Sequence, residues 1–163
     1  MSIGKETLFV DTLRHLVALD YDAISAYQAA VDRLESSKYR RALREFMTDH
    51  WRHIQELTPL VQELGGDAPT HADAKVILTK GKVLIGQIAG DRGILSAMRS
   101  NEDDTNLAYE NACARIDVPV NIREILQRGL LDERRHKAWI ERTLDRNQTT
   151  AVSTSAPYGT HLY

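Results

Sequence analysis

Four long segments of the chain carry apolar residues at alternating spacings of three and four positions. This spacing places the apolar side chains along one face of an α-helix, and such a face has to be buried against other helices. The sequence therefore predicts an all-α protein built as a four-helix bundle. The predicted helices cover residues 5–34, 38–64, 94–116 and 120–145.

The connections between these helices predict how the bundle is wound. Residues 67–93 form a long crossover, within which residues 75–88 predict one short extra helix. Short connections on either side give two antiparallel helical hairpins, and hairpins joined by one long crossover form one bundle domain, residues 1–146. Residues 147–163 are rich in Thr, Ser and Ala, which predicts an irregular or disordered tail.

Each predicted apolar stripe is interrupted near its middle by ionisable residues, which would all point into the bundle at a similar depth. Burying an unpaired carboxylate costs several kcal/mol, so acids and imidazoles that converge in a core need compensation. Divalent cations provide it, because carboxylate and neutral imidazole are their usual ligands. The candidate metal ligands are Asp20, His50, His53, Glu102, Glu133 and His136.

The two halves of the chain repeat this pattern. Asp20 precedes Tyr27 by seven positions, and Glu102 precedes Tyr109 by the same interval. The next helix in each half carries two candidate ligands three positions apart, which lie on one helical face. These pairs are His50 with His53, and Glu133 with His136. A pseudo-twofold axis would therefore place the metal between the two hairpins.

Composition excludes several other classes of protein. Net charge is −2, with acids and bases interspersed, whereas a nucleic-acid-binding surface needs a basic stripe. No run of about 18 apolar residues occurs, so no membrane-spanning helix is expected. The first residues carry acids and lack the apolar segment of a signal peptide, so a cytoplasmic protein is expected. The single cysteine, Cys113, excludes an internal disulfide framework and a cysteine zinc cluster.

The helices also resemble those of the ferritin-like superfamily, which includes the bacterioferritins and rubrerythrins. The similarity covers residues 8–145 and is most specific at residues 131–144, LDERRHKAWIERTL, which match a Glu-x-x-His pattern. It extends to LVALDYDAISAY at 16–27 and DHWRHIQELTPLVQELG at 49–65. The segment NEDDTNLAYENA at 101–112 is similar to a bacterial ferritin-like family of unknown function.

This resemblance implies a ferritin-like bundle with a non-haem di-iron centre. Glu133 would bridge two metal ions, with Asp20 and Glu102 as terminal carboxylate ligands. His53 and His136 would each bind one ion. Members of the superfamily use such centres to oxidise ferrous iron, to reduce oxygen or peroxide, or to store iron. The resemblance thus implies iron as the cofactor, with manganese or zinc as alternatives, and ferroxidase or other oxidoreductase activity.

The sequence departs from the superfamily pattern in three places. His50 stands where a bridging carboxylate is usual, so two divalent ions would leave a net charge of about plus one on the ligand set. The second ion should then bind more weakly or not at all, and a mononuclear zinc site is the alternative. Trp51 occupies the position of the haem-binding methionine of bacterioferritins, so no haem is expected. The single cysteine leaves out the cysteine-rich module of rubrerythrins.

Other interpretations stay open at the level of sequence. The protein could be a non-catalytic metal-binding or stress-related bundle that acts through assembly or partners. A storage cage needs outer surfaces that the sequence does not identify, and a homodimer is expected instead. Without metal, the residues would pair with one another, Asp20 with His53 and Glu102 with His136. Asp49, beside the apolar stripe, is interpreted as a solvated residue.

Overall fold

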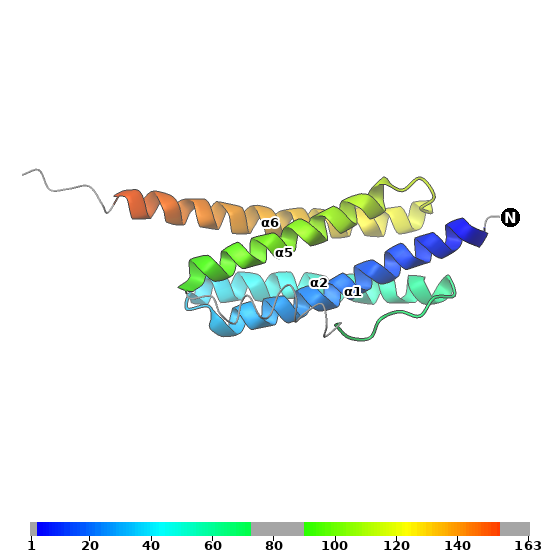
Figure 1. Cartoon of the computed structure of the whole chain (residues 1–163), viewed down its shortest axis with the longest axis horizontal. Helices are drawn as coiled ribbons and strands as arrows, with labels where there is room; N and C mark the ends of the chain where they lie inside the picture. The colour runs from blue at the N-terminus through cyan, green and yellow to red at the C-terminus, as the bar shows by residue number, and fades with distance from the viewer. Residues whose placement is uncertain (1–2, 73–89, 154–163) are drawn as a thin grey trace, which may run out of the picture.

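The computed structural model describes residues 3–72 and 90–153, and this part of the chain is an all-α four-helix bundle (Figure 1). Helices α1 and α2 form one antiparallel hairpin, and α5 and α6 form the other. The short extra helix predicted at 75–88 lies outside the described residues. The helices are α1 (Ile3–Arg33), α2 (Ser37–Glu63), α5 (Gly90–Ala114) and α6 (Val120–Ser153).

Helix α6 is longer than the sequence predicts. The predicted helix ends at Asp145, whereas α6 continues to Ser153 and includes the start of the segment 147–163 that composition predicts to be irregular. No Gly or Pro occurs between Asp145 and Ser153. Extending an existing helix by one residue costs far less than starting a new one, so the helix runs on in the absence of a stop signal. The rest of that segment lies outside the described residues.

Hydrogen bonds at the helix ends fix the first hairpin against the second. The Ser36 hydroxyl caps α2 by accepting the backbone N–H of Tyr39 at 3.3 Å. The Asp91 carboxylate, in the first turn of α5, accepts the backbone N–H groups of Glu35 at 2.7 Å and Ser36 at 2.9 Å. This contact ties the α1–α2 turn to the start of the second hairpin, which sets the depth at which the two hairpins face each other.

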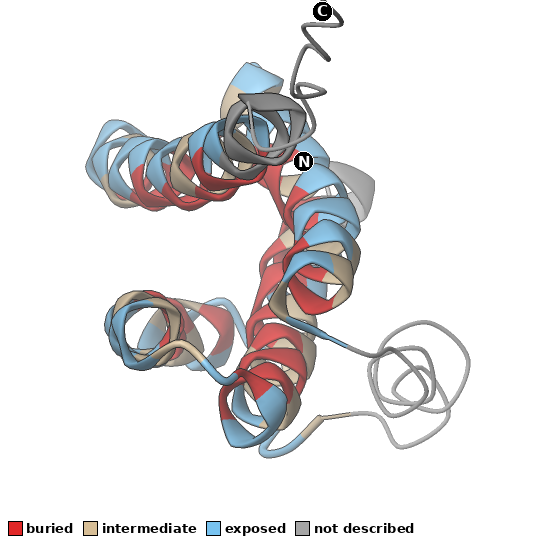
Figure 2. Cartoon of the chain, turned by 90° about the vertical axis from the view of Figure 1, so that its left-hand side faces the viewer, coloured by how far each residue is buried: buried red, intermediate tan, exposed pale blue. Residues whose placement is uncertain are grey.

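Two apolar clusters occupy the two ends of the bundle, and a polar layer lies between them. Helix α1 packs against α2 and α5, and α5 packs against α6, while α2 and α6 contact each other less closely. Figure 2 shows the buried residues facing the middle of this arrangement. Members of one cluster include Leu13, Leu57 and Leu126, and members of the other include Leu43, Leu95 and Ile140. The apolar clusters therefore seal the polar layer at both ends.

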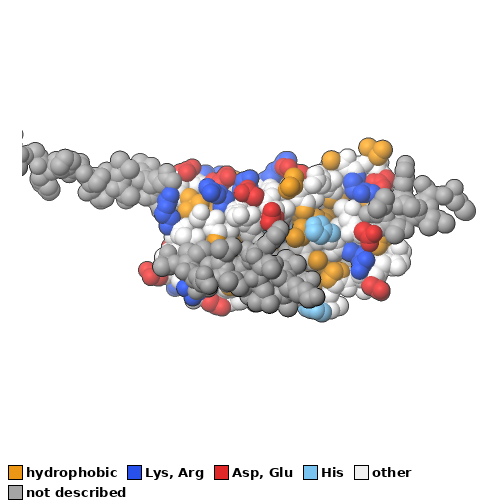
Figure 3. Space-filling view, viewed as in Figure 1, with side chains coloured by type: hydrophobic (Ala, Val, Ile, Leu, Met, Phe, Trp, Pro, Cys, Tyr) orange, Lys and Arg blue, Asp and Glu red, His pale blue; other side chains and the backbone are white. Residues whose placement is uncertain are grey.

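The outer faces of the helices are mainly polar, and the exposed large apolar side chains include Leu107, Ile116 and Val120. Figure 3 shows acidic and basic side chains intermixed on the face in view. None of the described helices combines the length and the apolar character needed to cross a membrane. The apolar residues of the bundle lie mainly on its buried faces, as the periodicity predicts.

Candidate metal centre

The six candidate ligands predicted from the sequence come together in the polar layer. They are Asp20 on α1, His50 and His53 on α2, Glu102 on α5, and Glu133 and His136 on α6. His53 is 2% exposed, and the other five have no exposed surface. The six form two overlapping groups of four residues, in each of which one N or O atom per residue lies within 4.8 Å of the others. Both groups include His50 and Glu133.

We call the group completed by Asp20 and His53 the α1/α2 half of the centre, and it is closed by hydrogen bonds among its own residues. Asp20 Oδ1 lies 2.9 Å from His50 Nδ1 and 3.3 Å from His53 Nδ1. The Tyr109 hydroxyl donates to Asp20 Oδ2 at 2.9 Å. Both carboxylate oxygens of Asp20 are thereby engaged. The pairing of Asp20 with His53 expected without metal is present, and His50 shares it.

We call the group completed by Glu102 and His136 the α5/α6 half, and it is more open on its inner side. The Tyr27 hydroxyl donates to Glu102 Oε1, and Glu102 Oε2 is 3.7 Å from His136 Nδ1, too far for a hydrogen bond. Phe46 stacks on the His136 imidazole, with 4.3 Å between the ring centroids. The pairing of Glu102 with His136 is thus a loose ion-pair contact. The Glu102 carboxylate is held mainly by Tyr27, and the His136 ring packs against Phe46.

Two aspartates that the sequence analysis did not assign to the site hold the imidazoles from behind. Asp49 on α2 lies 3.0 Å from His136 Nε2, and Asp132 on α6 lies 3.3 Å from His53 Nε2. Each aspartate therefore reaches a histidine of the opposite helix. The interpretation of Asp49 as a solvated residue is wrong: its side chain is 13% exposed, because α6 covers that flank of α2.

Two arginines join these aspartates into a ring of alternating charge between α2 and α6. Arg135 lies 2.5 Å from Asp49 and 3.0 Å from Asp132. Arg52 lies 3.1 Å from Asp49 and also pairs with Asp132. Burial would raise the pKa of Asp49, but the hydrogen bond to His136 and the two arginines lower it to about 2. Asp49 is therefore ionised at neutral pH and acts as a firm acceptor for the imidazole N–H.

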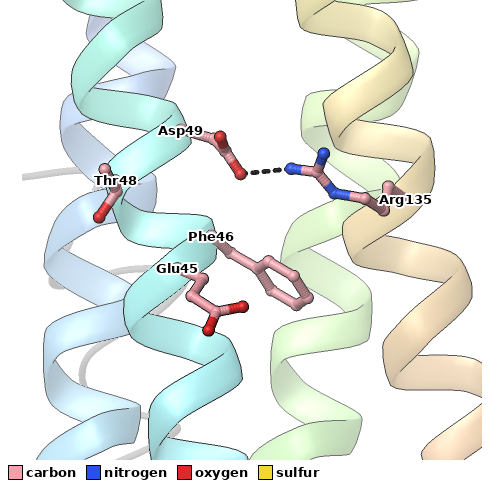
Figure 4. A pocket seen from close by; sticks show the side chains of 5 residues that line it. All are labelled: Glu45, Phe46, Thr48, Asp49 and Arg135. Carbon is pink, nitrogen blue, oxygen red and sulfur yellow. Dashed lines mark hydrogen bonds and ion pairs between the residues drawn. The ribbon is translucent and has the colours of Figure 1, made fainter.

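A surface pocket of about 450 Å³ lies between α2 and α6, next to the α5/α6 half. Figure 4 shows Asp49 reaching across it to Arg135, with Phe46 projecting from α2 into the same space. Because Phe46 stacks on His136 and Asp49 bonds it, the pocket is separated from the buried centre by a single layer of side chains.

The side chains of the centre carry charges of both signs. Burial would lower the pKa of His50, but neighbouring carboxylates, Glu133 foremost, raise it to about 9. Burial would also lower the pKa of His53, but its hydrogen bonds to Asp132 and Asp20 raise it to about 10. Burial and the charge of Glu133 raise the pKa of Glu102 to about 8, and burial lowers that of His136 to about 4. At neutral pH, binding of a cation must therefore displace protons.

Several buried ligand atoms have no hydrogen-bond partner among the described residues. A buried polar atom left without a partner costs roughly 1–3 kcal/mol, and these atoms all face the interior of the centre. Imidazole nitrogens and carboxylate oxygens are the ligands that Fe, Mn and Zn ions take in proteins. The residues present therefore fit a divalent metal ion. The unpartnered atoms are His50 Nε2, Glu102 Oε2, both carboxylate oxygens of Glu133, and His136 Nδ1.

Comparison with known proteins places the chain in a family. A family model described as a domain of unknown function, DUF2383, matches residues 9–115, which is most of the chain. The chain belongs to the DUF2383 family. No curated protein matched the sequence of this DUF2383 chain.

Two crystal structures share the fold of this DUF2383 protein. One, of a conserved hypothetical protein, rv2844, from Mycobacterium tuberculosis, has a TM-score of 0.71 and 14% identity over 97% of this chain and 99% of that one. The other is of ferritin-like, diiron-carboxylate proteins from Bacillus anthracis, with a TM-score of 0.69 and 21% identity over 86% of this chain and 98% of that one. At these identities the likeness concerns the fold, and it confirms an all-α four-helix bundle that resembles the ferritin-like fold.

The DUF2383 sequence contains a repeated pattern that could have identified Asp49 and Asp132 as part of the site. Residues 49–53 read DHWRH and residues 132–136 read DERRH. Both segments have Asp in the first position, a candidate ligand in the second, Arg in the fourth and His in the fifth. The repeat that links His53 with His136 therefore extends to the aspartates and arginines around them. Comparing the two helices position by position would have found this outer layer.

Proposed function

We propose that this DUF2383 protein binds iron in its buried centre and uses it to consume oxygen or peroxide. The observation that carries the proposal is the set of buried ligand atoms that have no hydrogen-bond partner among the described residues and that lie on α2, α5 and α6. Iron bound there supplies one-electron chemistry to a small oxidant. Reduction of one hydrogen peroxide to two waters would need two protons and two electrons, one from each of two ferrous ions held by these residues.

The chain contributes orientation and shielding to such a reaction. Tyr27 fixes Glu102, and Asp49 fixes His136, so the ligands are set before any metal arrives. The apolar clusters at both ends exclude bulk water, which limits the centre to small reactants. The raised pKa of Glu102 means that this carboxyl can hold a proton at neutral pH and release it when a cation binds.

The pocket between α2 and α6 is the access route that best suits this function. Glu45 and Asp49 give it two carboxylates, which favour an approaching cation, and Asp49 contacts His136 directly. Movement of Arg135, whose side chain is 54% exposed, would loosen the contacts of Asp49 without disturbing the apolar core.

The test is to measure metal content and Fe(II) oxidation on the same purified sample. Metal-free protein is loaded with Fe(II) without oxygen, analysed for bound iron, and then mixed with oxygen or peroxide while near-ultraviolet absorbance follows ferric iron. We expect bound iron that is oxidised faster than the same iron in buffer. A Glu133→Gln variant should lose both binding and oxidation, because Glu133 belongs to both ligand groups. Oxidation at the buffer rate by iron-loaded wild-type protein would rule out the redox role.

A second candidate function is a non-catalytic zinc site in a bundle that acts through assembly, with a homodimer as the expected form. It is favoured by the set of two imidazoles and two carboxylates in the α5/α6 half, which can fill a tetrahedral zinc site completely. Competitive loading with equal Zn(II) and anaerobic Fe(II) separates the two candidates. Exclusive retention of zinc, with no iron oxidation, would favour the structural role.

A further inference from the structure

The two halves of the centre differ in which ligand atoms are free. In the α1/α2 half, Asp20 accepts hydrogen bonds through both oxygens, one of which serves His50 and His53 together. The remaining nitrogen of His53 faces Asp132. A metal ion in this half would therefore have to break contacts that the protein already makes.

In the α5/α6 half, each ligand keeps at least one atom that makes no hydrogen bond to the described residues. Glu102 is held by Tyr27 through one oxygen, and its other oxygen has no partner. His136 is held by Asp49 through Nε2, and its Nδ1 has no partner. His50 Nε2 and the two oxygens of Glu133 complete a set of atoms without hydrogen-bond partners among the described residues, and Glu133 Oε1 also lies 3.5 Å from His50 Nδ1 and 3.5 Å from His53 Nδ1. A metal ion here gains four ligands and breaks no hydrogen bond between them.

We propose that the centre loads in a fixed order, with the first divalent ion bound in the α5/α6 half by Glu102, Glu133, His136 and His50 Nε2. A second ion enters the α1/α2 half only by taking Asp20 and His53 away from their present hydrogen bonds. Asp20 is thus a positioning residue for the first ion and a ligand only for the second. The inference rests on the proposed metal binding and adds to it which half is filled first.

The contact between Asp20 and His50 gives His50 its direction. A neutral imidazole has one N–H and one lone pair, and a carboxylate that accepts the N–H leaves the lone pair on the other nitrogen. His50 Nδ1 lies 2.9 Å from Asp20 Oδ1, so when the ring gives up one proton to an incoming ion the lone pair falls on Nε2, the atom that faces the α5/α6 half. Histidine ligands are commonly oriented by a carboxylate in this way. Asp20 therefore orients the His50 imidazole so that Nε2 can bind the first ion.

Ligand charge supports the same order. Glu102 and Glu133 together neutralise one divalent ion, and the imidazoles add no charge. A second ion brings only one new carboxylate, Asp20, so the loaded centre becomes positive inside an apolar bundle. Isolated buried charge is costly, which makes the second ion the weaker one.

The internal repeat identifies His50 as a residue that makes the two halves of the centre differ. His50 occupies in α2 the position that Glu133 occupies in α6, each directly after an aspartate and three residues before a histidine. Replacing His50 with glutamate would give both halves the same ligand at this position. It would also release Asp20 from the imidazole and supply the missing negative charge.

The experiment is an anaerobic titration of metal-free protein with Co(II), whose visible absorption reports its coordination, followed by elemental analysis after gel filtration. The wild-type chain should retain one ion and bind a second at least about tenfold more weakly. Asp20→Asn should keep the first ion, since the amide oxygen still accepts from His50, and lose the second. The matched change Glu102→Gln should lose the retained ion, because it removes one of the two carboxylates that hold it. His50→Glu should retain two ions.

Each outcome bears on a separate claim. Two ions bound with equal affinity by the wild-type chain would overturn the loading order, and this result needs no variant to fold. Loss of the retained ion in Asp20→Asn but not in Glu102→Gln would also overturn it, provided that circular dichroism shows both variants to be helical. No retained ion in the wild-type chain would instead refute the proposed metal binding.

Discussion

Asp49 should raise the metal affinity of the α5/α6 half although it does not face the interior of the centre. It lies 3.0 Å from His136 Nε2, while His136 Nδ1 points toward Glu102. In the neutral imidazole, Asp49 holds the single proton on Nε2 and leaves the lone pair of Nδ1 for a metal ion. In Asp49→Ala the proton is free to move to Nδ1, where it would face Glu102 Oε2 and block the nitrogen that binds metal.

The expected loss is moderate and selective. Removing the carboxylate behind a histidine ligand typically lowers metal affinity by about 10–100-fold, which is roughly 1.4–2.8 kcal/mol of binding free energy. The free energy of unfolding of the metal-free protein should fall by less, about 1 kcal/mol. The reason is that the surface pocket beside Asp49 lets water replace the lost acceptor of His136.

The measurement is a competition titration of the first ion against a chromophoric chelator. The matched control is Asp132→Ala, which removes the equivalent contact from His53 in the α1/α2 half. That variant should bind the first ion with an affinity close to that of the wild-type chain. Equal weakening in the two variants, or an unchanged affinity in Asp49→Ala, would refute the reasoning.

Three other perturbations test the centre from different directions. Gly129→Ala would place a Cβ atom 2.5 Å from Tyr109 Cε1. The steric clash should cost about 1–3 kcal/mol of stability, which exceeds the gain of about 1 kcal/mol from replacing glycine in a helix. Urea unfolding should therefore show a lower free energy of unfolding, and adding Tyr109→Leu, which removes the clashing ring, should restore part of it. In the metal-free protein, the free energy of unfolding should fall as pH rises from 6.5, the ordinary pKa of histidine, to about 9, the pKa of His50 in the folded protein. The reason is that the folded state favours the protonated ring. Urea unfolding across this pH range tests the sign, and an increase in the free energy of unfolding would contradict it. Metal at a hundred times its dissociation constant should stabilise the fold by about 2.7 kcal/mol and raise Tm by roughly 5–11 °C, an effect that a chelator should reverse in a thermal melt.

The fold and the burial of the six candidate ligands could be predicted because both follow from helical periodicity. A residue on the apolar stripe of a helix points inward whichever neighbour packs beside it. Asp20 and Glu102 could therefore be placed in the core before any contact was known. The same logic explains why α6 was predicted too short, since periodicity fades beyond Asp145 although nothing in the sequence stops the helix before Ser153.

Asp49 and Asp132 could not be placed in this way. Each precedes a candidate ligand by one residue and so lies on the flank of its helix, where an acid is usually solvated. Only the approach of α2 and α6 brings that flank against an imidazole of the opposite helix. Likewise, counting charges predicts a weaker second ion, but only the orientation of His50 shows which half of the centre keeps its ligand atoms free.

The two halves of the centre differ in ligand chemistry although the contacts around them match. Each tyrosine reaches the acid of the other hairpin, and each outer aspartate reaches the imidazole of the opposite helix. Those contacts follow from the repeat, which puts equivalent positions in equivalent places. The ligands differ at two positions, where Asp20 is opposed to Glu102 and His50 to Glu133. One difference shortens a carboxylate and the other removes one, and both fall in the first hairpin. The three carboxylates of the centre therefore supply three negative charges, one fewer than two divalent ions would need.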